Sequence, residues 1–419
     1  MKVFKFGGAS IKNVQAIQNM IAIIGKYQNE SLIIIVSAMG KSTNALEELI
    51  DLTLTKKKYH NELNKFEQYH KNLIHELPTP HFNELEKEIT FYFNQLKYFL
   101  ERVSLENYSK FYDRIVSIGE LLSSTIISFY LKQSNIKTLW ADARTLIKTD
   151  HTFQDGKVDW DSTATNITTL ISSNSDYSIF LTQGYIGSTH DNETTTLGRE
   201  GSDYTAAIFA YCLNAESVTI WKDVPGILNA DPKIINDAIL FKELPYNEAS
   251  EMTYYGAKVI HPKTIKPLAN KKIPLHVRCF ETPENKGTII RDCILKEIPT
   301  TIIYKENQCL VSFKSKDLSF INEKGLSILF NALHQLNMTI HIMQNSAISF
   351  SVCIDYHPQK VVELIKKLSS EFIILYNTGL QLVTIKNYTN KTLTKYKPKG
   401  ELLLEQVSRN NYRILFQPE

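Results

Sequence analysis

The sequence predicts an α/β domain, an open sheet sandwiched by helices, followed by two smaller α+β units of ferredoxin-like order. Short apolar strands alternate with helical patterns over the first three-fifths of the chain, as in a parallel sheet covered on both faces. Near residue 298 this alternation gives way to a β-α-β-β-α-β order. A length of 419 residues is enough for two or three such domains.

In the first domain, residues 3–6 predict a strand and Leu32–Ala38 a continuous apolar strand. Further strands are expected at 137–140, 178–182 and 217–221, and helices at about 117–132, 203–213 and 247–257. Residues 55–112 are polar and helical in pattern, with proline at 78 and 80 between two helices. We interpret them as an inserted helical hairpin, which either packs on the domain or covers a substrate pocket.

In the C-terminal part, we assign residues 308–377 to one ferredoxin-like unit. The other combines 298–307 with 378–419, a truncated and interleaved unit that lacks a full second helix. Its strands are expected at 300–304, 380–385, 401–406 and 412–416, with a short helix at 390–396. The first domain then covers residues 1–297.

The composition is that of a soluble globular protein, with 43% hydrophobic and 22% charged residues. The net charge of +3 is too balanced to favour nucleic acid or an acidic membrane as partner. The five cysteines have no CxxC spacing, which argues against a zinc site and favours reduced thiols. Since no apolar stretch is long enough for a signal peptide, we expect a cytoplasmic location.

The first segment with chemical potential is Lys5 to Ser10, where a strand ends in Gly7 and Gly8. Glycines let backbone N–H groups approach a phosphate, and a lysine adds a point charge for it. On its own this turn is more often structural. Segment 37–44 ends the next apolar strand and should reach the same sheet edge, although it also suits a helix cap.

The densest segment is Thr194 to Tyr204, between a strand and a helix. It contains Arg199, the residue type that binds carboxylates through two hydrogen bonds, and Asp203, which otherwise caps the helix. Glu120, placed at a helix start, either pairs with a substrate ammonium or is a solvated acid. The segments 221–233 and 255–262 add acids and lysines suited to a nucleotide.

These six segments, in order and spacing, resemble the aspartate kinases of the amino acid kinase family, whose catalytic domain is typically followed by paired ACT domains. The resemblance extends through the whole chain. It implies a monofunctional enzyme that transfers phosphate from ATP, with Mg²⁺, to the side-chain carboxylate of L-aspartate. That reaction is the first step of lysine, threonine and methionine biosynthesis.

The resemblance also implies residue roles. Lys5 and Asp203 would be catalytic. The aspartate pocket would be formed by Ser37, Thr43, Glu120, Arg199 and Ser202, with Arg199 on the α-carboxylate and Glu120 on the α-ammonium. The nucleotide would be bound by Lys5, Gly7, Gly8, Ser10, Lys222, Asp223, Gly226, Asp231, Lys233 and Lys258. Mg²⁺ would be held by phosphates and water, without a protein ligand.

For the ACT domains, the resemblance implies a homodimer or higher oligomer and feedback inhibition by lysine, threonine or both. The effector residues would be Lys324, Gly325, Gln344, Asn345 and Ser346. At position 347 an alanine stands where some lysine-sensitive members carry an acid. A purely dimer-forming ACT pair is the alternative reading.

Some positions depart from the usual pattern. Ala9 replaces a common threonine, Glu200 a common glycine, Lys222 a threonine and Lys233 an arginine. Two other functions stay open: a sibling kinase that acts on another carboxylate, and a catalytically silent amino acid sensor. Intact Lys5 and Asp203 argue against the sensor, and the Glu120 and Arg199 pair with the ACT tail argues against the sibling kinase.

Overall fold

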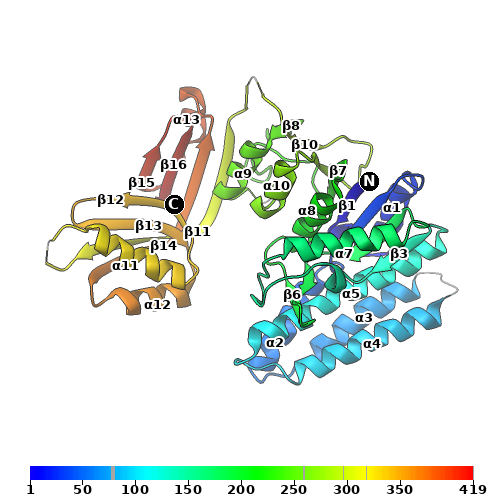
Figure 1. Cartoon of the computed structure of the whole chain (residues 1–419). Coiled ribbons are helices and arrows are strands. Elements are labelled where there is room, and N and C mark those ends of the chain that lie inside the picture. Colours follow the sequence, from blue (N-terminus) through cyan, green and yellow to red (C-terminus); the bar gives the residue numbers. More distant parts are fainter. Residues whose placement is uncertain (77–80, 258–259, 296, 318, 419) are drawn as a thin grey trace. The chain divides into compact units, whose positions relative to one another are not determined.

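The computed structural model describes residues 1–76, 81–257, 260–295, 297–317 and 319–418 (Figure 1). The chain forms two compact units, and each is described by itself. The first comprises Met1–Ile227, Leu240–Ser250 and Val259–Ile294. The second comprises Leu228–Ile239, Glu251–Lys258 and Leu295–Glu419.

The first unit is built on an eight-stranded sheet with the order β3-β4-β2-β1-β7-β9-β10-β8. Neighbouring strands are parallel except for β9 and β10. The strands are β1 (Lys2–Phe6), β2 (Leu32–Val36), β3 (Thr138–Ala141), β4 (Ile179–Gln183), β7 (Ser217–Lys222), β8 (Glu243–Pro245), β9 (Leu275–Cys279) and β10 (Thr288–Arg291). All five residues of β2 are buried, as its continuous apolar sequence predicts.

Helices and one hairpin complete this unit. The helices are η1 (Gly8–Ile11), α1 (Val14–Gly25), α2 (Ser42–Leu54), α3 (His60–His75), α4 (Phe82–Leu100), α5 (Tyr108–Gln133), α6 (Ala143–Leu146), α7 (Trp160–Ser173), α8 (Gly201–Leu213), α9 (Tyr246–Tyr255, whose last five residues belong to the second unit) and α10 (Pro262–Asn270). The hairpin is β5 (Ile186–Ser188) and β6 (Thr194–Thr196). Helix α8 packs on β1, β2 and β7, while α5 packs on β2, β3 and β4.

The inserted helical hairpin is confirmed as α3 and α4, which lie side by side (Figure 1). Their apolar faces, including Leu63, Phe66 and Phe93, join the core of the domain. Leu77, Pro78 and Pro80, expected at the turn, lie outside the described residues. Helix α5 is long and apolar enough to cross a membrane, but 83% of its apolar window is buried within the fold, as in a core helix.

The second unit is built on a six-stranded antiparallel sheet with the order β12-β13-β11-β14-β16-β15. Its strands are β11 (Thr301–Ser315), β12 (Ile340–Asn345), β13 (Ser349–Asp355), β14 (Phe372–Lys386), β15 (Glu401–Val407) and β16 (Asn411–Gln417). Its helices include α11 (Glu323–Gln335), α12 (Pro358–Leu368) and α13 (Asn390–Tyr396). Helices α11 and α12 cover a core that contains Val311, Phe350 and Leu364.

Two pairs of predicted strands are each a single long strand. The strand expected at 300–304 continues to Ser315, within the unit assigned to 308–377, as β11. The strand expected at 380–385 begins at Phe372, within that same unit, as β14. The reason is continuous pairing between them, from Thr301–Lys386 to Ser315–Phe372, with register shifts near Gln308. The fold class, an α/β unit followed by an antiparallel α+β unit, is as predicted. The boundaries of two separate ACT domains stay a prediction.

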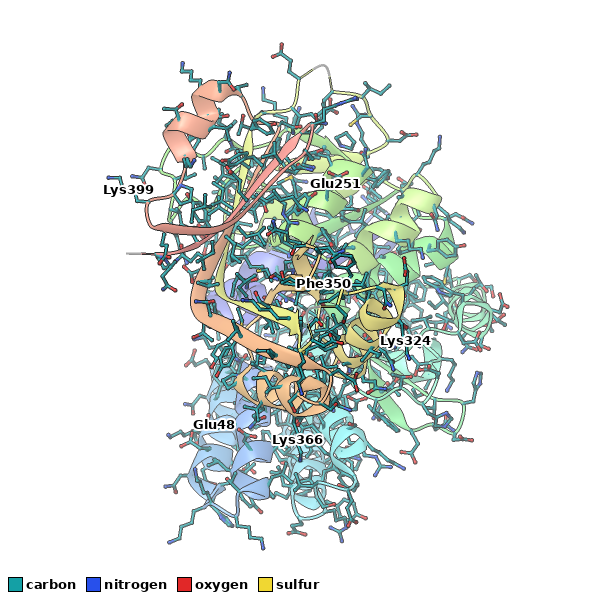
Figure 2. The ribbon with its side chains drawn as sticks, turned by 90° about the vertical axis from the view of Figure 1, so that its left-hand side faces the viewer. Glu48, Glu251, Lys324, Phe350, Lys366 and Lys399 are labelled. Atoms are coloured by element: carbon teal, nitrogen blue, oxygen red, sulfur yellow. The ribbon has the colours of Figure 1, made fainter. Side chains whose placement is uncertain are left out.

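Two segments of the predicted catalytic domain belong to the second unit by their contacts. The backbone carbonyl of Asn229 accepts a hydrogen bond from Ile302 N at 2.8 Å, and Ala230 and Ile235 are buried in the second unit's core. Likewise, Glu251 (labelled in Figure 2) forms an ion pair with Lys386 at 2.5 Å. Sequence order alone places both segments with the first unit, because their partners follow more than 70 residues later.

Candidate functional site

A cavity of about 530 Å³ lies where strands of the first sheet end. It is lined by residues at or just after the ends of β1, β2, β4 and β7, by the start of α8 and by α5. The predicted site residues that line it are Lys5, Gly8, Ser37, Thr43, Glu120, Arg199, Ser202, Asp203 and Lys222. Carboxyl ends of parallel strands share one sheet edge, which brings these distant segments together.

Asp203, at the start of α8, is the electrostatic centre of the cavity. Its carboxylate lies 2.7 Å from the Lys5 ammonium through Oδ1 and 3.1 Å from the Lys222 ammonium through Oδ2. Only 2% of the Asp203 side chain is exposed. Burial raises the pKa of this carboxyl, but Lys222 and Lys5 outweigh burial and hold the pKa below its usual value. Asp203 is therefore ionised at neutral pH.

The glycine turn after β1 is held tightly against the segment after β2. A Cβ on Gly8 would lie 2.6 Å from the Ala38 carbonyl oxygen, and Gly40 N donates to the Gly8 carbonyl at 3.0 Å. Gly8 is thus required by this close approach as well as suited to a phosphate. Gly7 and Ser10 are not among the lining residues, and the Ser10 hydroxyl donates to the Trp221 carbonyl at 3.3 Å.

Glu120 lies in the middle of α5, not at a helix start as expected, because this helix begins at Tyr108. Its Oε1 accepts a 3.4 Å hydrogen bond from Ala38 N, while Oε2 is buried and has no hydrogen-bond partner among the described residues. Burial raises the pKa of this carboxyl to about 8. A buried carboxylate oxygen without a donor, facing a cavity, suits an ammonium group of a ligand.

The segments after β1 and β2 are both contacted by the inserted hairpin. The Tyr69 hydroxyl donates to the Lys12 carbonyl at 2.7 Å, and His70 Nε2 lies 3.3 Å from the Ser42 hydroxyl. Burial lowers the pKa of His70 to about 4, so its ring is neutral. In the part of the chain that the structure describes, no residue of α3 or α4 is among those lining the cavity. Of the two expected roles, these contacts favour packing.

Strand β6, which precedes Arg199, is held in place by hydrogen bonds to Asp113. This buried carboxylate accepts hydrogen bonds from Gln154 N at 2.9 Å, Thr196 N at 2.9 Å and the Thr196 hydroxyl at 2.7 Å. Burial raises the pKa of Asp113 to about 6, against the effect of these hydrogen bonds. The Arg199 side chain itself is exposed at the rim, where it can reach a ligand carboxylate.

Four lining residues were missed by the sequence analysis: Glu47, Tyr112, Gln154 and Tyr185. Tyr112 donates to Glu47 Oε1 at 2.5 Å. Tyr185 has a φ of 74°, a left-handed conformation that is rare for an aromatic residue and frequent at functional sites. Because Tyr185 follows the end of β4, the strand-end rule that selected Ser37 was a signal for it as well.

The other predicted nucleotide residues that the structure describes are not among those lining the cavity. Gly226 has a structural reason, since a Cβ there would lie 2.6 Å from the Thr288 hydroxyl. Asp231 accepts a hydrogen bond from Lys233 N at 2.9 Å, and both residues belong to the second unit. Asp223 is exposed, and Lys258 lies outside the described residues. The nucleotide roles of these residues stay predictions.

The predicted effector residues lie on two neighbouring segments of the second unit. Lys324 (Figure 2) and Gly325 are in the first turn of α11, where Asn322 caps the helix by accepting from Gly325 N at 3.1 Å. Gln344 and Asn345 end β12, and Ser346 follows them. Ile321 N donates to the Ala347 carbonyl at 3.2 Å, so the two segments are in contact. Their effector role stays a prediction.

Known proteins resemble this chain both in sequence and in architecture. Residues 1–279 match the family described as the Amino acid kinase family. Lysine-sensitive aspartokinase 3 of Escherichia coli (strain K12) is 30% identical over 357 residues, which cover 84% of this chain and 78% of that protein.

Two solved structures of E. coli aspartokinase III align with the whole chain and with 96% of their own. The complex with aspartate and ADP, described as the R-state, has a TM-score of 0.88 at 26% identity. The complex with lysine and aspartate, described as the T-state, has a TM-score of 0.80 at 25% identity. The chain therefore has the architecture of a protein that has been seen with an amino acid and a nucleotide bound.

Proposed function

Because this chain belongs to the amino acid kinase family and is similar to aspartokinases over most of its length, we propose that it is an ATP-dependent aspartate kinase. It phosphorylates the side-chain carboxylate of L-aspartate to give 4-phospho-L-aspartate and ADP. One observation carries this proposal: a single cavity combines Lys5, Asp203 and Lys222 with Glu120 and Arg199, which suit the two charged ends of an amino acid.

In this mechanism the enzyme binds aspartate through the α-carboxylate and the α-ammonium group of the substrate. Arg199 at the rim binds the α-carboxylate, and the buried Oε2 of Glu120 accepts from the α-ammonium. Ser37, Thr43 and Ser202 complete the pocket. The side-chain carboxylate is already ionised at neutral pH, so it needs no strong general base to act as the nucleophile.

Phosphoryl transfer then depends on positioning and on neutralising charge. A carboxylate oxygen forms a bond to the γ-phosphorus while the bond to the β–γ bridging oxygen breaks, and its electron pair remains on ADP. Lys5 stabilises the charge that moves between the β- and γ-phosphates. Asp203 fixes the Lys5 ammonium through its 2.7 Å contact.

Mg²⁺ would neutralise phosphate charge in this reaction. Among the described residues there is no group of three His, Cys, Asp or Glu side chains arranged to hold a metal ion. We propose that this Mg²⁺ would be bound mainly by nucleotide phosphates and water, as Mg²⁺ prefers. The chain itself would contribute the charged side chains of the cavity, including Lys5, Lys222 and Asp203.

Regulation is proposed to act through the second unit. Lysine is the favoured effector, since the similar E. coli enzyme is described as lysine-sensitive and has been solved with lysine. Threonine sensitivity, a homodimer or higher oligomer formed by ACT units, and a cytoplasmic location belong to the same proposal. Titration of activity with lysine, threonine and methionine tests the effector.

The catalytic proposal is tested with the hydroxamate assay. The purified chain with ATP, Mg²⁺, hydroxylamine and L-aspartate is expected to give aspartyl hydroxamate, because hydroxylamine traps the acyl phosphate. Glutamate and N-acetylglutamate are assayed separately, each in place of aspartate. Product from glutamate alone would identify a sibling kinase, and no product from any of them would favour the silent sensor.

A further inference from the structure

Two lysines share one carboxylate at the centre of the cavity. Lys5 is on β1 and Lys222 ends the neighbouring parallel strand β7, in a register that pairs Phe6 with Trp221. From these positions the Lys5 and Lys222 ammonium groups contact opposite oxygens of Asp203, at 2.7 Å and 3.1 Å. Their side chains are only 10% and 19% exposed, so water screens these charges poorly.

This arrangement has one more positive charge than Asp203 can balance. Glu200 supplies the second negative charge: it lines the same cavity, and its Oε2 is buried without a hydrogen-bond partner among the described residues. Its left-handed φ of 53° is a further sign of a constrained position. Burial lowers the pKa of Lys222, but Asp203 and then Glu200 outweigh burial and raise it, so Lys222 stays charged.

We propose that Lys222 is a second catalytic cation, which rests on Asp203 in the free enzyme and contacts an oxygen of the transferring phosphoryl group when ATP is bound. Glu200 is the positioning anion that keeps this lysine charged within a cavity that already contains Lys5. The inference rests on the proposed aspartate kinase activity, and it gives Lys222 a role in the chemical step itself.

The chemistry is balanced without any proton transfer by Lys222. The substrate carboxylate forms the new O–P bond, the β–γ bridging bond breaks, and ADP leaves with the electron pair. During this step charge is spread over the three oxygens of the phosphoryl group. A fixed cation on each side of Asp203 stabilises that charge more in the transition state than in the ground state, which accelerates the reaction.

The test compares Lys222→Gln with Lys222→Arg and the control Lys12→Gln, a lysine that is exposed and does not line the cavity. In the hydroxamate assay, Lys222→Gln is expected to lower kcat by roughly a hundredfold, the loss typical of one charge-stabilising donor. Since ADP lacks the transferred group, the Kd for ADP should change less than threefold. Lys222→Arg should restore at least a tenth of the wild-type kcat, and Lys12→Gln should match wild type.

Glu200→Gln provides an independent measurement. Because Glu200 acts through Lys222, the double variant with Lys222→Gln should lose no more activity than Lys222→Gln alone. A kcat within twofold of wild type for Lys222→Gln, or additive losses in the double variant, would overturn the proposal. If Lys222→Gln fails to fold in thermal unfolding, a wild-type kcat for Glu200→Gln would overturn it. Wild-type activity on aspartate separately tests the proposed function.

Discussion

Each unit of the molecule contains a carboxylate placed between two basic side chains. The carboxylate is buried in the first unit and partly exposed in the second. In the first unit, Asp203 lies between two lysines, and its side chain is 2% exposed. In the second unit, Asp355 contacts Lys305 at 3.0 Å and His341 at 3.1 Å, and its side chain is 43% exposed.

The difference lies in what surrounds each carboxylate. Asp355 also accepts a hydrogen bond from Gln308 Nε2 at 2.9 Å, so its oxygens are satisfied by neighbours within the sheet. Asp203 instead faces a cavity that is also lined by Glu120 and Glu200, whose buried Oε2 atoms have no hydrogen-bond partner among the residues that the structure describes. Buried polar atoms left without partners are costly, and they mark the place where a ligand supplies the missing contacts. Similar residue types therefore form part of a candidate active site in the first unit and a structural cluster in the second.

The largest expected effect comes from removing the reactive carboxylate. Asp203→Asn removes the carboxylate charge that both the Lys5 and Lys222 ammonium groups contact, so both are held less firmly in position. We expect kcat in the hydroxamate assay to fall by about a thousandfold. The matched control is Asp355→Asn, which should retain wild-type kcat. Comparable losses in the two variants would remove the distinction between the clusters.

The second prediction concerns Glu120 and pH. Its pKa is raised to about 8 by burial, so at pH 7 this carboxyl is mostly protonated in the free enzyme and lacks the charge to form an ion pair with an ammonium. Between pH 7 and 8.5 the ionised fraction, and with it kcat/KM for aspartate, should rise roughly eightfold. Glu120→Gln should raise the KM for aspartate more than the KM for ATP and should abolish this rise. An unchanged pH profile in Glu120→Gln would place the titrating group elsewhere.

A third prediction uses the buried lysine of the second unit. The Lys386 side chain is 2% exposed, and its partner Glu251 is 53% exposed. Glu251→Gln removes a carboxylate from a buried ammonium and should lower the free energy of unfolding by about 1 kcal/mol, discounted for the exposure of the glutamate.

Lys386→Met, which removes the buried charge itself, should cost less than Glu251→Gln in urea unfolding. Kcat in the hydroxamate assay should be unchanged in both variants. A larger loss of stability in Lys386→Met would mean that its packing outweighs its charge.

The smallest expected effect is the stability change in Asp355→Asn. Burial raises the pKa of Asp355, but His341, Gln308 and Lys305 outweigh it and hold the pKa below the ordinary value of 3.8. A lowered pKa stabilises the folded state above pH 4, and this stabilisation is lost as the pH falls through the folded-state pKa. At pH 7 the variant should lose less than about 1 kcal/mol, since this ion pair is partly exposed. The difference in Tm from wild type should shrink below pH 4.

Much of the cavity could be predicted because it is built from strand ends. Lys5, Ser37 and Lys222 lie at or just after the carboxyl ends of apolar strands that are recognisable from local sequence, and parallel pairing brings such ends to one edge. The two inserted helices were also predictable from local sequence, because the periodicity of their apolar residues and the prolines between them are local signals.

Features that depend on distant partners were not predictable from the sequence. The contact of Lys222 with Asp203 requires the register between β1 and β7 and the start of α8, which no local pattern specifies. Glu120 was misplaced because α5 begins at Tyr108, whereas residues up to 112 were assigned to the inserted hairpin and the helix was expected to begin near residue 117. Segment 228–239 joins the second unit through Ala230 and Ile235, whose apolar partners lie in strands far along the chain.

The sheet order of the second unit has a consequence for how the protein reaches its folded state. Strand β16, the last in the sequence, lies between β14 and β15, so it completes the interior of the sheet. Until residues 411–417 have been synthesised, β14 exposes an open edge and β15 has no partner, and such edges promote aggregation. A stop codon at position 411, which removes β16 together with the residues after it, would therefore leave an aggregation-prone sheet rather than a slightly shortened domain.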